Sequence, residues 1–114
     1  MAKIDLSYLE SIAVGDKFFI KEMLDLFIKS TFPEIETIEK LSIKKDWDKI
    51  GLIAHRIKAP VQILGQTETY NLILTLEKNA KDKINLEQIN ELISKIKTNM
   101  VDINTEVKKI INVI

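Results

Sequence analysis

The sequence DWDKIGLIAHRIKAPVQILG, residues 46–65, reads as one amphipathic helix that carries the only histidine of the 114-residue chain. Its apolar residues recur at the i, i+3, i+4, i+7 spacing of a helix face that packs against a core. They are Ile50, Ile53, Ala54, Ile57, Val61 and Leu64. At roughly 100° per residue, His55 falls about 160° away from Ile57. Gly51, Lys58, Ala59 and Gln62 fall on the same outer face. The pattern therefore predicts a solvent-facing histidine with a lysine one turn farther on.

Two helices are expected before this stretch. A short one covers residues 6–14, with Asp5 as its cap and Gly15 as a left-handed stop. A long one begins at Asp16, and its apolar stripe continues in phase across Pro33. That continuity predicts a kink near residues 30–32 rather than a break. In the following turn, Asp46 is the expected cap of the histidine helix.

Two further helices are expected after Gly65. Thr67 is a plausible cap for a segment that reaches about residue 81, and Asn85 with Gln88 resembles a capping box. The last helix has a narrow apolar seam typical of bundles. The seam consists of Ile89, Leu92, Ile96, Met100, Ile103, Val107, Ile110 and Ile114. The sequence has no strand pattern. We therefore expect an all-α fold, an antiparallel four-helix bundle with a short N-terminal lid helix, as one domain over residues 1–114.

Composition narrows the possible partners and location. Apolar residues make up 46% of the chain and charged residues 30%, a balance typical of globular domains. Seventeen basic and 17 acidic residues cancel, so no net field favours nucleic acid or a membrane surface. Apolar runs are too short to span a membrane, and the N-terminus lacks a signal-peptide pattern. We expect a cytoplasmic monomer that binds neither nucleic acid nor membrane.

The residue inventory also limits the chemistry. The absence of cysteine excludes disulfides and thiolate metal sites, and one histidine cannot supply the paired ligands of a di-iron bundle or a histidine zinc site. A glycine-rich phosphate loop is absent. Composition alone leaves open a serine or threonine nucleophile with His55 as its base. Such chemistry would also need an oxyanion hole and a cleft, which a convex helix face does not offer.

The histidine stretch resembles a known family. Asp46-Trp47 followed by Ala54-His55-Arg56-Ile57-Lys58-Ala59 is similar to the Asp-Trp and Ala-His-x-x-Lys-Gly motifs of histidine-containing phosphotransfer (HPt) domains. Leu26-Phe27 with Pro33, then Gly65 and Leu76-Glu77, extend the resemblance to most of the chain. It implies a carrier that accepts a phosphoryl group from a receiver aspartate or a sensor histidine kinase and passes it to another receiver. Such a carrier has no nucleotide site, no cofactor of its own and no independent enzymatic activity.

The resemblance also implies roles for three residues. His55 is the phosphoacceptor, and its distal nitrogen, Nε2, attacks; the imidazole is substantially neutral at pH 7. Lys58 offsets charge on the transferring group, while a Mg²⁺ ion on the partner receiver is expected to do more of that work. Glu77 matches the position that contacts Nδ1 of the histidine, where a carboxylate would leave Nε2 as the nucleophile. Glu77 could equally pair with Lys81 at i+4.

Residues around His55 are candidates for binding a receiver. Ala59 keeps the surface low beside the imidazole, and Gln62 lies two turns from it. Leu52 and Ile63 flank the histidine face, where they form either a half-buried edge of the core or an apolar docking patch.

Two residues depart from the family pattern. Ala59 replaces the usual glycine, and Pro60 removes a backbone hydrogen bond to the Arg56 carbonyl, which predicts a bend beyond His55. A second hypothesis therefore stands beside the carrier. It is a phosphotransfer-like adaptor that binds receivers or other helices without accepting phosphate.

Overall fold

The structure is a computed structural model that describes residues 2–114; residue 1 of the expected domain lies outside the described residues. These residues form helices and connecting turns, and none of them lies in a strand, so the all-α prediction is confirmed. The elements are α1 (Ser7–Ala13), α2 (Lys17–Leu26), the π-helical turn η1 (Phe27–Thr31), α3 (Glu34–Ile43), α4 (Trp47–Ile63), α5 (Thr67–Asp82), the 3₁₀ turn η2 (Leu86–Gln88) and α6 (Ile89–Val113).

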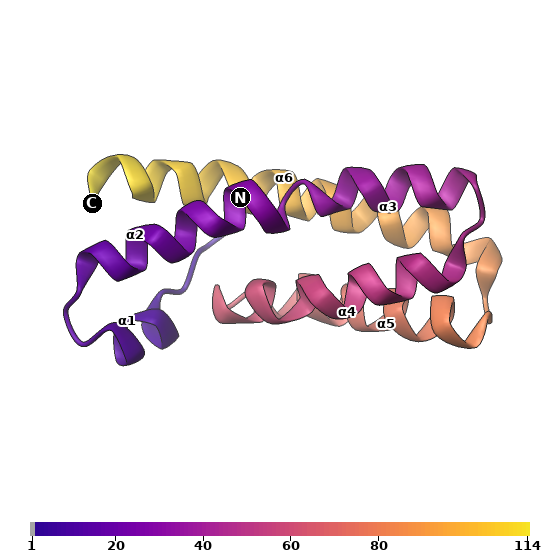
Figure 1. The fold of residues 1–114 in the computed structure, drawn as a ribbon, viewed down its shortest axis with the longest axis horizontal. Helices are drawn as coiled ribbons and strands as arrows, with labels where there is room; N and C mark the ends of the chain where they lie inside the picture. The colour runs from indigo at the N-terminus through magenta and orange to yellow at the C-terminus, as the bar shows by residue number, and fades with distance from the viewer. Residues whose placement is uncertain (1) are drawn as a thin grey trace.

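The helices lie along one long axis and make an elongated molecule of 44 × 21 × 21 Å. In Figure 1, α2, η1 and α3 follow one another beside α6, and α4 and α5 lie together below them. Among the described elements, α4 and α5 make the most extensive contact, and α4 also packs against α3. Helix α1 lies beneath α2, near the end of the molecule where the chain terminates. The histidine helix α4 is therefore held mainly by α5.

The predicted core face of α4 is confirmed. All six residues of its apolar stripe are buried, and His55 is exposed. The prediction for Gly51 is wrong, because Gly51 is buried against α5 rather than lying on the outer face. The periodicity gives the angular position of each residue around the axis of α4. It does not show how much of the surface of α4 the neighbouring helix covers.

The long helix departs from α geometry where Pro33 predicts an irregularity. Phe27–Thr31 forms a π-helical turn, and the backbone N–H of Phe32 donates to the carbonyl of Phe27, five residues earlier, at 2.8 Å. Proline has no N–H and its ring crowds the preceding turn, so widening that turn relieves the conflict. The apolar stripe keeps its phase across the turn, with Phe27, Thr31 and Ile35 all buried.

The predicted cap Asp46 is confirmed, and Asp16, the predicted start of the long helix, is a cap as well. A carboxylate oxygen of Asp16 accepts from the Phe19 N–H at 3.1 Å, and one of Asp46 accepts from the Lys49 N–H at 3.3 Å. Asp5 accepts from the N–H of Ser7 at 2.9 Å, with Leu6 between them in the capping position.

The helix starts predicted after Gly65 are wrong in detail. Thr67 is the first residue of α5, and Gln66 precedes it in the capping position. Asn85 does not form a capping box; it is left-handed, with φ of 50°, and opens the 3₁₀ turn η2. In the last helix the predicted seam is mostly buried, but Ile93 is buried in addition and Leu92 is only half-buried.

Within residues 2–114, every helix is too short or too polar to cross a membrane.

Candidate functional site

His55 lies on the exposed side of α4, and 61% of its side-chain surface is accessible. Its neighbours Ala54 and Ile57 are almost fully buried, at 0% and 1% exposure. These buried contacts fix the rotation of α4 about its axis, and the rotation in turn sets the direction of the imidazole. The outward placement of His55 thus follows from the packing of the opposite face.

Glu77 on α5 is the polar centre of the site. Its side chain is only 11% exposed, and both carboxylate oxygens are occupied. Oε2 lies 2.7 Å from Nδ1 of His55 and 2.9 Å from Nζ of Lys81, and Oε1 accepts from Nζ of Lys58 at 2.8 Å. The two alternatives for Glu77, contact with the histidine or pairing with Lys81, therefore occur together.

The charge state of Glu77 determines which proton the imidazole carries. Burial raises the pKa of Glu77, but hydrogen bonds from Lys58, Lys81 and His55 outweigh that effect and hold its pKa at about 2. The side chain is therefore an anion at neutral pH and can only accept hydrogen bonds. Nδ1 of His55 must then be the donor, so the neutral ring keeps its lone pair on Nε2.

Lys58 is positioned one turn after His55, as the sequence indicates. Its side chain is 23% exposed, because it turns toward α5 and binds Glu77. Its ammonium group and that of Lys81 lie on the same carboxylate. Counted over Glu77 and these two lysines, the cluster carries one net positive charge at neutral pH, which suits an incoming anion.

The four residues predicted to bind a partner differ in exposure. Leu52 is 63% exposed, and Ala59 and Gln62 are exposed. Ile63 is half-buried and packs against the core, where it lines a small apolar cavity with Pro60. The structure thus places Leu52, Ala59 and Gln62 on the free surface, whereas Ile63 lies at an edge of the core.

The sequence reasoning missed the role of Gly51, which lies against Lys81 and Ala80 where α4 packs on α5. Gly51 had no local signal, since a glycine within a helix does not show which helix approaches it. The i+4 spacing did indicate the pairing of Glu77 with Lys81, but nothing in the sequence indicated that Glu77 makes this contact and the contact with His55 at the same time.

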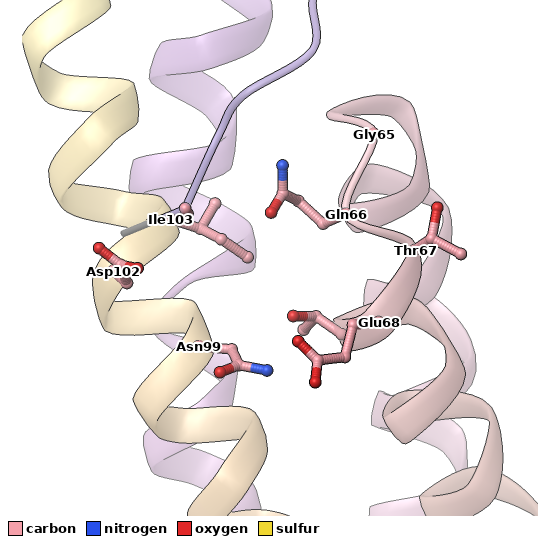
Figure 2. A pocket seen from close by; sticks show the side chains of 9 residues that line it. Gly65, Gln66, Thr67, Glu68, Asn99, Asp102 and Ile103 are labelled. Carbon is pink, nitrogen blue, oxygen red and sulfur yellow. The ribbon is translucent and has the colours of Figure 1, made fainter.

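A separate polar hollow of about 380 Å³ lies between the start of α5 and α6. Figure 2 shows Gln66, Thr67 and Glu68 on one side of it and Asn99 and Asp102 on the other. Residues of the His55 cluster do not line this hollow. The candidate site therefore lies apart from this hollow, on the exposed side of α4.

No family model matches the chain, and no solved structure matches it. Over 71 residues, 62% of its length, it is 24% identical to the virulence sensor protein BvgS of Bordetella pertussis, and equally to the proteins of that name in Bordetella bronchiseptica and Bordetella parapertussis. The match spans 6% of the length of each relative. The chain is therefore similar to a small part of these sensor proteins.

Proposed function

We propose that the protein is a phosphoryl carrier of a two-component phosphorelay, in which His55 accepts a phosphoryl group from a receiver aspartate or a sensor kinase and passes it to another receiver. The observation that carries the proposal is the 2.7 Å contact between Nδ1 of the exposed His55 and the Glu77 carboxylate. The resemblance to HPt domains and the similarity to part of a sensor protein support it.

The transfer step follows from the charges of the cluster. Nε2 of His55 attacks the phosphorus of an aspartyl phosphate, the N–P bond forms, and the P–O bond to the aspartate breaks. The aspartate leaves as a carboxylate, and the ring, which keeps its Nδ1 proton, becomes cationic. Glu77 stabilises that developing positive charge. Lys58 offers its charge to the phosphoryl oxygens as they approach.

In this proposal the chain is a carrier rather than an enzyme and needs no cofactor of its own. The Mg²⁺ ion that assists the transfer is expected on the receiver. The fold is taken as an antiparallel four-helix bundle with α1 as its lid, acting as a cytoplasmic monomer. Receivers dock over Leu52, Ala59 and Gln62, which are exposed around His55.

The proposal is tested by phosphorylation of the purified chain. Phosphoramidate, a small donor that transfers its phosphoryl group to imidazole with loss of ammonia, and a radiolabelled phospho-receiver serve as the two donors. We expect a single phosphoryl group that is labile in acid and stable in base, as a phosphoramidate bond is. His55→Ala should abolish the labelling by both donors.

Labelling that survives His55→Ala would contradict the carrier function. A wild-type chain that binds a receiver tightly and yet takes no label from it would also contradict it, and would favour the adaptor alternative. In that case, Ala59→Gly and Pro60→Ala, at the two positions that depart from the HPt pattern, are the substitutions to test for restored labelling.

A further inference from the structure

At Gly51, the side chain of Lys81 on α5 lies close against the backbone of α4. A Cβ atom at position 51 would lie 2.8 Å from Cγ of Lys81, closer than side-chain atoms pack. The backbone nitrogen of Lys81 and Cβ of Ala80 would be 3.6 and 3.8 Å away, which are ordinary contact distances. The missing side chain of Gly51 therefore leaves room for the stem of Lys81 in particular.

This contact lies next to the candidate site on both helices. Gly51 is one turn before His55 on α4, and Lys81 is one turn after Glu77 on α5. The stem of Lys81 passes Gly51, and its ammonium group reaches Oε2 of Glu77 at 2.9 Å. The same oxygen accepts from Nδ1 of His55 at 2.7 Å. Lys81 and His55 thus share one carboxylate oxygen.

A carboxylate so close to an imidazole has two opposite effects. It orients the ring through Nδ1, but its negative charge also favours the imidazolium, in which Nε2 is protonated and cannot attack. Cations on the same carboxylate weaken the second effect and keep the first. Lys58 and Lys81 provide such cations, one on each oxygen.

We propose that Gly51 and Lys81 are positioning residues of the His55 site. The space at Gly51 lets Lys81 reach Glu77, and the charge of Lys81 lets the carboxylate orient the imidazole without holding it protonated. The role given to Gly51 and Lys81 rests on the proposed phosphotransfer function. The experiments below nevertheless measure titrations of His55 and Glu77 and do not require phosphoryl transfer.

The charged groups in the His55 cluster come from both helices of the pair. They are Lys58 on α4 and Glu77 and Lys81 on α5, while Arg56, beside His55 on α4, pairs with Glu34 instead. Lys78, also on α5, pairs with Asp82 at 3.3 Å instead. Lys78 is therefore a matched control, because its substitution removes one charge from α5 without touching Glu77.

The first test follows His55 and Glu77 by NMR in the intact chain. In Lys81→Met, the titration midpoint of the Glu77 carboxyl should rise by about one unit, and the share of protonated imidazole at pH 7 should rise with it. Lys81→Arg, which keeps the charge, should restore both values, and Lys78→Met should leave them unchanged. Unchanged titrations in Lys81→Met would overturn the proposal, and so would an equal effect of Lys78→Met.

The second test uses Gly51→Ala, which touches neither His55 nor Glu77. Alanine favours a helix over glycine, which offsets part of the cost of moving Lys81, so this variant should stay folded. It should nevertheless shift both titrations in the direction of Lys81→Met, and adding Lys81→Met to it should cause no larger shift than Lys81→Met alone. Titrations identical to wild type would show that Gly51 does not position Lys81. If these shifts occur and the wild-type chain takes no phosphoryl group, the proposed function fails while the positioning of Lys81 stands.

Discussion

Glu77 joins three cationic or polar groups from two helices, and its ionisation links the site to the stability of the fold. Its pKa of about 2 in the folded chain lies below the ordinary value of 4.5. A group whose pKa is lowered by folding adds stability above its unfolded pKa, and this stability is lost as the pH falls through the folded pKa. The relevant window for Glu77 therefore runs from about pH 5 down to about pH 2.

The first prediction tests this window with Glu77→Gln. Between pH 5 and pH 2 the free energy of unfolding of the wild type should fall by roughly 2–3 kcal/mol more than that of the variant. The reason is that glutamine has no carboxylate to protonate. Urea unfolding at several pH values measures both curves. Parallel curves would mean that the contacts of Glu77 contribute no net stability.

The second prediction separates binding from transfer at Lys58. Lys58→Ala removes a charge that acts where the phosphoryl group moves, so it should slow transfer roughly tenfold and change receiver affinity much less. Calorimetry gives the affinity, and a radiolabel chase gives the rate. Lys78→Ala is the control, because Lys78 is exposed and paired with Asp82. An equal loss in affinity and rate would instead make Lys58 a docking residue.

At the scale of helices, two irregularities of the backbone meet at one place. The π-helical turn η1 and Pro60 of α4 line the same small apolar cavity, together with Met23, Ile63 and Leu64. Pro60 lies inside α4, which remains continuous from Trp47 to Ile63. Because proline has no N–H, the carbonyl of Arg56 loses its usual partner within the helix.

The third prediction concerns this proline. Pro60→Ala should restore the backbone hydrogen bond and raise the free energy of unfolding by about 1–3 kcal/mol. The amide of residue 60 should then exchange slowly with solvent. Thermal and urea unfolding measure the stability, and hydrogen exchange measures the new bond. A loss of stability would show that the ring's contacts beside the cavity outweigh the missing hydrogen bond.

At the scale of the whole molecule, net charge contributes little to the attraction of a partner. The formal net charge is zero at pH 7, so long-range steering is weak and recognition must depend on local contacts around His55. The exposed Leu52 is the strongest apolar candidate, since it lies one turn from His55 and 63% of its surface is accessible.

The fourth prediction compares two apolar residues of the same helix. Leu52→Asp should weaken receiver binding by roughly tenfold or more, with the melting temperature unchanged, because burying a leucine at an interface contributes about 1.5–3 kcal/mol. Ile63→Asp should lower the melting temperature, because Ile63 packs against the core. Unfolding by Leu52→Asp would place that face in the core, and unchanged binding would place the docking surface elsewhere.

The sequence by itself determined the features that depend on neighbours along the chain. These are the helical state, the buried stripe of α4, the helix start at Asp16, the Asp46 cap and the irregularity before Pro33. Each follows from spacing or from a side chain acting on its own turn. The outward placement of His55 is also determined by the sequence, because His55 lies on the face of α4 opposite the buried stripe.

Only the tertiary structure decided what lies at the boundary between helices. Gly51 is buried because α5 passes over it, and Glu77 is nearly buried because two lysines and His55 satisfy its oxygens. In the sequence, a glycine or a glutamate beside an apolar stripe looks the same whether water or a neighbouring helix covers it. Periodicity describes one helix alone, whereas burial of a polar group depends on partners supplied from a second helix.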